Sequence, residues 1–140
     1  TVYNSCTIAG KVKVGENTWI GPYTALDGGK AGIKIGSNCS ISSGVNIIGH
    51  DSVKWALSGG KQKYEYASVS IGNNCFIGTN AIITKGVSIG NHCLVGANAV
   101  VTKNFPNNSI ILGIPARIAG RVLIDNDCVH LDYNNHTNNI

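Results

Sequence analysis

The sequence predicts an all-β chain folded as a triangular parallel β-helix, and three observations lead to this fold class. An aliphatic residue recurs every six positions over most of residues 2–101, glycine and asparagine recur in fixed slots between these anchors, and only 13% of residues are charged. A period of six is a multiple of the strand period of two and does not fit the 3.6-residue helical period. One hexad cannot bury its anchor alone, so the hexads must stack.

The anchors keep the period of six with two departures. Three residues are inserted around residues 28–30, and an 18-residue interruption precedes Ile71, which restores the phase. Three hexads make one coil of 18 residues, so residues such as Ile77 and Val95 are expected to stack. Burial of each anchor contributes about 1.5 to 3 kcal/mol. The fourteen anchors are Val2, Ile8, Val14, Ile20, Leu26, Ile35, Ile41, Ile47, Ile71, Ile77, Ile83, Ile89, Val95 and Val101.

Glycine and asparagine mark the turns between hexads. Glycine directly follows seven anchors, and asparagine stands three positions after five of them. Both residues tolerate left-handed backbone angles, which tight turns require.

The remaining segments complete a single predicted domain. Residues 1–105 form the β-helix, and residues 49–70 form a loop extruded from one corner, whose aromatic residues argue against plain disorder. Residues 106–120 are expected to form a strand, a turn at 113–115 and a short helix that cover the open end of the prism. Residues 121–140 are expected to be a peripheral tail.

Composition excludes several classes of function. Four of the five cysteines share one slot of the repeat and are interpreted as small buried fillers in a protein of the reducing cytoplasm. No Cys or His pattern predicts a metal site. A net charge of +4 is too small for nucleic acid and suits a phosphorylated small molecule. No apolar run is long enough for a membrane span, and no signal peptide is visible. The sequence starts at Thr1 without Met, which is compatible with a missing native N-terminus.

His50 is the first candidate for chemistry. It stands where the last regular hexad leads into the loop, and histidine is suited to accept a proton near neutral pH. Taken alone, a histidine in a turn is the commoner interpretation. The segments GHDSV, IGNNCFIGTNAIITKGVSIGNHCLVGANAVVTK and GIPAR change this, because together they resemble the hexapeptide-repeat acetyltransferases. The chain is most similar to sugar O-acetyltransferases of cell-surface polysaccharides and to maltose and galactoside acetyltransferases, over roughly residues 14 to 120.

The resemblance implies a left-handed parallel β-helix that assembles as a homotrimer. It further implies acetyl-CoA as co-substrate and direct transfer of the acetyl group to a hydroxyl of a sugar or oligosaccharide, with His50 as general base. Each site would lie in a cleft between adjacent prisms, with the histidine on one wall and much of the CoA contact on the other. Residues matching the family's CoA positions are Thr79, Ala97, Thr102, Lys103 and Arg117.

For the acceptor, Asp27 is the strongest candidate. It lies one coil below the start of the loop, where it is expected either to orient His50 or to bind a sugar hydroxyl, unless it is only a turn residue. Tyr23 and Trp55 are weaker candidates, since aromatic rings pack against sugars. The galactoside-type members carry an asparagine in the region of residues 20–22, and none stands there. The other histidines, His92, His130 and His136, are expected to face solvent.

Other functions of this fold must be weighed against O-acetylation. N-acetylation of an amino or nucleotide sugar and a non-catalytic β-helix scaffold are the alternatives. A γ-type carbonic anhydrase needs three zinc-binding histidines, and only His50 and His92 lie in the repeats. Ice binding favours a flat threonine column, which the threonines do not form.

Overall fold

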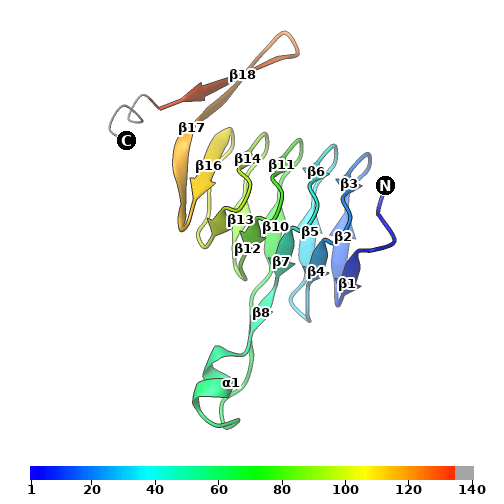
Figure 1. The fold of residues 1–140 in the computed structure, drawn as a ribbon, viewed down its shortest axis with the longest axis vertical. Helices are drawn as coiled ribbons and strands as arrows, with labels where there is room; N and C mark the ends of the chain where they lie inside the picture. Colours follow the sequence, from blue (N-terminus) through cyan, green and yellow to red (C-terminus); the bar gives the residue numbers. More distant parts are fainter. Residues whose placement is uncertain (135–140) are drawn as a thin grey trace.

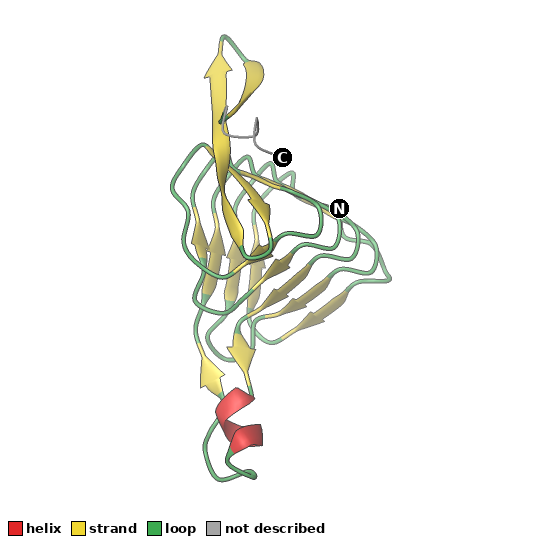
Figure 2. Ribbon diagram, turned by 60° about the vertical axis from the view of Figure 1, so that its left-hand side comes forward, coloured by secondary structure: helices red, strands yellow, loops and turns green. Residues whose placement is uncertain are grey.

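In a computed structural model, which describes residues 1–134, three parallel sheets form the sides of a triangular prism (Figures 1 and 2). We call them sheets A, B and C. Sheet A includes β3 (Trp19–Ile20), β6 (Ser40–Ile41), β11 (Phe76–Ile77), β14 (Leu94–Val95) and β16 (Ser109–Gly113). Sheet B consists of β1 (Thr7–Ala9), β4 (Ala25–Asp27), β7 (Asn46–Ile48), β12 (Ile82–Ile83) and β15 (Val100–Val101). Sheet C consists of β2 (Val12–Val14), β5 (Ile33–Ile35), β10 (Val69–Ile71) and β13 (Ser88–Ile89).

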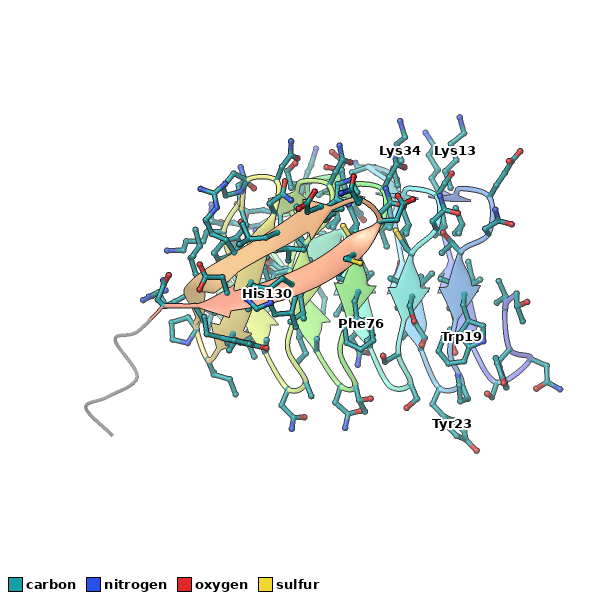
Figure 3. All side chains as sticks on the ribbon, turned by 90° about the horizontal axis from the view of Figure 1, so that it is seen from above. Lys13, Trp19, Tyr23, Lys34, Phe76 and His130 are labelled. Carbon is teal, nitrogen blue, oxygen red and sulfur yellow. The ribbon has the colours of Figure 1, made fainter. Side chains whose placement is uncertain are left out.

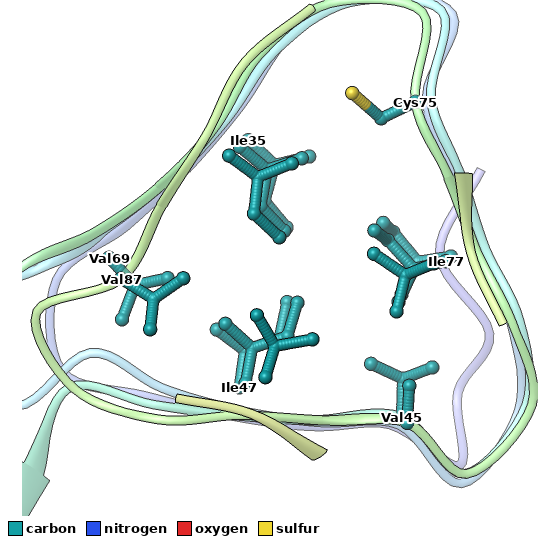
Figure 4. Packing of buried hydrophobic residues seen from close by; sticks show 14 of the residues in the cluster. Ile35, Val45, Ile47, Val69, Cys75, Ile77 and Val87 are labelled. Atoms are coloured by element: carbon teal, nitrogen blue, oxygen red, sulfur yellow. The ribbon is translucent and has the colours of Figure 1, made fainter. Parts of the chain in front are cut away.

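The predicted stacking of the anchors is confirmed across both departures from the repeat. Ile77 pairs with Val95 on one side and with Ile41 on the other. Leu26 pairs with Ile47 across the three-residue insertion, and Ile47 pairs with Ile83 across the loop. All these side chains point into the prism and are fully buried, and Figure 4 shows the anchors of the three sides meeting at its centre.

The asparagines and glycines of the turns have different roles, although the sequence predicted left-handed backbone angles for both. Asparagines at the predicted slot have φ between 55 and 60°, as expected: Asn17, Asn38, Asn74, Asn80 and Asn98. The glycines that follow the anchors do not have positive φ, so the prediction was wrong for them. They are required because successive coils approach closely there. A Cβ on Gly36 would lie 2.6 Å from the carbonyl oxygen of Gly72.

The cysteine slot forms a column inside one corner. Cys39, Cys75 and Cys93 are buried, and their thiols donate to backbone carbonyls of the next coil at 3.1–3.2 Å. Cys6 is half-buried, and Cys128 is exposed. The interpretation as small fillers therefore holds for the three central residues, whose thiols also add donors for backbone carbonyls at this corner.

The loop leaves the prism at the corner between sheets B and C (Figure 2). Its stem is the antiparallel pair β8 (His50–Asp51) and β9 (Glu65–Tyr66), and its tip contains the short helix α1 (Val53–Leu57). Val69 and Ser70, which the predicted range 49–70 includes, already lie in β10.

The C-terminal region differs from its prediction. β16 continues sheet A, and the segment expected to become a short helix is strand β17 (Ala116–Asp125), which pairs antiparallel with β16. β18 (Cys128–Tyr133) completes an exposed hairpin within the segment predicted as a peripheral tail. Alternating Val122 and Ile124 favour a strand, and Asn126 and Asp127, both with positive φ, form the turn. Within residues 1–134, no helix is long and apolar enough to cross a bilayer.

Candidate active site

His50 and Asp27 meet at the corner where the loop begins. Asp27 is the last residue of β4 and pairs with Ile48 of β7, two residues before His50. The Nδ1 atom of His50 lies 3.8 Å from Oδ1 of Asp27, and the two side chains are 25% and 43% exposed. The same carboxylate oxygen accepts the backbone N–H of Gly29 at 3.1 Å, which fixes its position. The sequence prediction that Asp27 lies just below the histidine is confirmed.

The Nδ1 atom of His50 is buried and has no hydrogen-bond partner among the described residues. A buried polar atom without a partner costs about 1 to 3 kcal/mol, and such atoms are concentrated at functional sites. Oδ1 of Asp27 lies 3.8 Å from this atom, a few tenths of an ångström beyond hydrogen-bond distance. With Nδ1 facing the carboxylate, Nε2 is the ring atom left to accept a proton.

The three-residue insertion makes room for the imidazole ring. Gly29 has φ +52°, and a Cβ there would lie 3.1 Å from the ring of Tyr66 and 3.6 Å from His50 Nδ1. His50 is also stacked against the loop tyrosines, with ring centroids 5.8 Å from Tyr66 and 6.4 Å from Tyr64. The ring orientation is therefore set by packing against the loop.

An ion-pair network ties the loop stem to the next coil. Lys85, in the turn after β12, places its Nζ 2.9 Å from Oδ2 of Asp51 and 3.6 Å from Oε2 of Glu65, which also pairs with Lys54. The hydrogen bond from Lys85 holds the pKa of Asp51 below its ordinary value, and that from Lys54 does the same for the pKa of Glu65. Reciprocally, Asp51 raises the pKa of Lys85. The network fixes the residue next to His50 to the rigid prism.

A hollow of about 260 Å³ opens beside this pair on the outer face of sheet B. Its floor consists of small or uncharged side chains of β1, β4 and β7, and His50 and Asp27 stand at one edge. The hollow presents a base and a carboxylate to a small polar acceptor. Its lining residues are Thr7, Ala9, Ala25, Leu26, Asp27, Asn46, Ile48 and His50.

The residues matched to CoA lie along two different corners. Thr79 and Ala97 are exposed at the corner between sheets A and B, each two positions after a stacked anchor. Gly113 takes the same place above Ala97, and the turn after it leads to the exposed Arg117, so these three predicted residues follow one edge. Thr102 and Lys103 are exposed at the corner between sheets B and C. Nζ of Lys103 lies 5.7 Å from the Phe105 ring centroid.

Of the two aromatic candidates, Tyr23 lies at another corner than His50, whereas Trp55 is linked to His50 through Tyr64. Tyr23 is 76% exposed at the corner between sheets A and B, where Figure 3 shows it projecting from the prism. Trp55 lies in α1 and packs edge-on against Tyr64, with centroids 5.7 Å apart. Of the remaining histidines, His92 is half-buried, His130 is exposed, and His136 lies outside the described residues.

Sequence reasoning missed the groups that hold His50 in place. Tyr64, Tyr66 and Lys85 carry no motif, and their roles depend on pairing between β8 and β9. The doubled glycine at 28–29 was a usable signal, because it falls on the insertion directly below the loop exit. Within residues 1–134 no cluster of three or more His, Cys, Asp or Glu side chains is placed to hold a metal ion.

Comparisons with known proteins agree with this architecture. Residues 11–49 and 68–103 match the family described as the hexapeptide repeat of succinyl-transferase. The curated protein CapG of Staphylococcus aureus is 48% identical over 89 residues, which cover 61% of this chain and 50% of CapG. The chain thus spans about half the length of this curated relative.

Solved structures with the same fold include three informative neighbours. AntD, an N-acyltransferase from Bacillus cereus in complex with dTDP and 3-hydroxybutyryl-CoA, has a TM-score of 0.74 at 27% identity, covering 84% of this chain and 66% of AntD. A hexapeptide-repeat acetyltransferase from Vibrio cholerae O1 biovar eltor, complexed with acetyl coenzyme A, has a TM-score of 0.70 at 26% identity, covering 79% and 60%. A maltose O-acetyltransferase from Clostridium difficile 630 has a TM-score of 0.66 at 29% identity, covering 86% and 68%.

Proposed function

Because the chain belongs to the hexapeptide-repeat family, whose members fold as left-handed parallel β-helices, we propose that it transfers an acetyl group from acetyl-CoA to a hydroxyl of a sugar or oligosaccharide. The observation that carries this proposal is the pairing of His50 with Asp27 at the edge of a hollow. The acetyl-CoA complex of the Vibrio cholerae neighbour and the maltose acceptor named for the Clostridium difficile neighbour support the donor and the acceptor class.

In the proposed reaction, Nε2 of His50 accepts the proton of the acceptor hydroxyl. The oxygen attacks the thioester carbonyl, the C–S bond breaks, and the proton passes from His50 to the departing CoA sulfur. Asp27 faces Nδ1, so its carboxylate stabilises the imidazolium that forms during the transfer. The products are an acetyl ester and CoA, and the enzyme carries no covalent intermediate.

The proposed site lies between subunits of a homotrimer. Within one chain, His50 stands at one edge of sheet B, whereas Thr79, Ala97 and Arg117 follow the other edge. The full width of the sheet therefore separates the base from these CoA candidates. A second prism placed against sheet B brings its Thr79 edge toward the His50 of the first. This arrangement explains why the CoA candidates lie at an exposed corner and why the hollow beside His50 is open on one side.

The proposal is tested by assaying acetyl-CoA turnover with a panel of sugars, nucleotide sugars and oligosaccharides. His50→Ala should lower kcat by about 10²- to 10⁴-fold, as for loss of a general base, with CoA binding retained. His130→Ala, in the exposed hairpin, is the matched control. Lys103→Ala with Arg117→Ala should mainly raise the KM for acetyl-CoA. Unchanged turnover in His50→Ala would remove His50 from the mechanism. A native chain that neither binds nor consumes acetyl-CoA would instead fit a scaffold.

An N-acyltransferase acting on an amino or nucleotide sugar is the second candidate, and one comparison favours it. A mutant form of AntD was solved in complex with dTDP-4-amino-4,6-dideoxyglucose and coenzyme A. The same base and hollow accept an amine in place of a hydroxyl. The acceptor panel separates the two, because hydroxylamine cleaves an ester product and leaves an amide intact.

A further inference from the structure

The outer face of sheet C carries a second hollow, larger than the one beside His50. It has a volume of about 670 Å³ and is lined by residues 10–13, 31–34 and 68–70. The two hollows lie on either side of one corner, since the consecutive residues Ala9 and Gly10 line the first and the second hollow, respectively. Lys11 at this corner donates its backbone N–H to the carbonyl of Gly29, the residue packed below the His50 ring.

Lysines with no acidic partner surround this second hollow. Lys13 and Lys34 are directly opposed on neighbouring strands, and Figure 3 shows both projecting from the same side of the prism. Lys11 lines the hollow, and Lys30 precedes it, with Nζ 4.4 Å from the Tyr66 ring centroid. Among residues 1–134, no carboxylate lies within 4.0 Å of any of these four ammonium groups.

The pairing of Lys13 with Lys34 works against stability. Like charges directly opposite on neighbouring strands repel and are destabilising. The chain has eleven basic and seven acidic residues, so the seven basic residues other than these four lysines balance the acidic ones. The four lysines therefore account for the whole net charge of +4. A concentrated, unpaired charge beside a hollow indicates an anionic ligand.

We propose that this hollow binds the diphosphate group of the acceptor, so that the sugar is acetylated while attached to a nucleoside diphosphate or a polyprenyl diphosphate. Two ammonium groups on strands about 4.8 Å apart can each contact one of two linked phosphates. Ser70 adds a hydroxyl beside them, hydrogen-bonded to Ser88 at 3.0 Å. A sugar bonded to that diphosphate then extends across the Ala9 corner toward His50. The link to acetylation rests on the proposed function, whereas the diphosphate site does not.

Calorimetric titration without acetyl-CoA tests the site directly. Pyrophosphate should bind the native chain, and Lys13→Ala with Lys34→Ala should weaken this binding about tenfold or more, as should the glutamine pair. One control pair should bind pyrophosphate as the native chain does: Lys61→Ala with Lys63→Ala, which removes the same charge from the loop tip. Absent pyrophosphate binding, or equally tight binding by the native chain and by the Lys13→Ala, Lys34→Ala variant, would overturn the proposal. So would equally tight binding of glucuronate, which carries a carboxylate instead of a diphosphate.

Two further measurements identify the source of the diphosphate and separate this inference from the transferase proposal. UDP binding more tightly than pyrophosphate assigns a nucleotide sugar, and farnesyl diphosphate binding more tightly assigns a polyprenyl carrier. If the chain acetylates sugars, the double variant Lys13→Ala, Lys34→Ala should have a higher KM for the acceptor and an unchanged KM for acetyl-CoA. Turnover of uncharged sugars without any pyrophosphate binding would leave the transferase standing and reject the diphosphate site.

Discussion

Replacing Asp27 by asparagine isolates the effect of its charge on His50. Asparagine keeps the shape and the oxygen that accepts the Gly29 N–H, so the turn is preserved. At the observed 3.8 Å, a unit charge pair contributes about 4 kcal/mol at an effective dielectric constant of about 20 and about 1 kcal/mol in water. With side chains 25% and 43% exposed, solvent screening favours the lower end. A loss of about 1–2 kcal/mol corresponds to a fall in kcat of about 5- to 30-fold.

Steady-state kinetics with both substrates varied measure this fall and also separate the two roles open to Asp27. A carboxylate that stabilises the imidazolium lowers kcat and leaves the acceptor KM nearly unchanged. A carboxylate that binds a sugar hydroxyl raises the acceptor KM instead. Asp132→Asn, in exposed β18, removes the same charge far from His50 and is the control. Full kcat with an unchanged acceptor KM in Asp27→Asn would refute both roles.

Three further predictions concern the elements that hold the site. Gly29→Ala should lower kcat, because its Cβ approaches the Tyr66 ring at 3.1 Å; Gly59→Ala, with φ +66° but nothing within 4 Å, carries the same backbone strain and should retain kcat. Ile77→Ala, at a fully buried anchor, should reduce the free energy of unfolding by about 2–5 kcal/mol in urea titrations, and Ile8→Ala, 48% exposed at the open end, by clearly less. Lys85→Met should lower the Tm at pH values above 3.8 and 4.5, the ordinary pKa values of the Asp51 and Glu65 carboxyl groups. Because folding lowers the pKa of Asp51 and Glu65, their contribution is lost as the pH falls through the lowered pKa values, so the Tm difference should shrink as the pH falls below the ordinary values.

The fold was predictable because each coil repeats the same local solution. Anchors such as Ile47 and Ile83 pair across the loop, because an insertion of one whole coil leaves the phase unchanged. The C-terminal hairpin was not predicted, because its pattern is short and its pairing begins on β16, beyond the last anchor. Local signals in PARIAGR do not distinguish a strand from a short helix when the deciding contact is the edge of an existing sheet.

Only those residues of the site whose positions follow from the hexad repeat could be predicted from the sequence. His50 and Asp27 could be placed together because the coil register sets the height of each residue. The contacts of Tyr64, Tyr66 and Lys85 depend on how the loop folds back, which no period in the sequence specifies. The same limit applies to Tyr23, which lies at another corner than His50 and can share a site with it only when a second chain brings those corners together. Trp55 belongs to the same loop as His50 and reaches it through Tyr64.

Both departures from the period of six fall on the same corner, and this coincidence builds the site. In a regular repeat, equivalent positions of successive coils carry the same kinds of side chain, so none of them is suited to a single catalytic base. The insertion at 28–30 swings the chain outward below, and its glycines leave space that a Cβ would fill. The interruption above sends His50 into that space and returns Tyr66 to cover it. Without the insertion there is no space for the His50 ring, and without the loop no histidine enters that space. The insertion and the loop therefore act together, although 18 residues of regular coil separate Lys30 from Gly49.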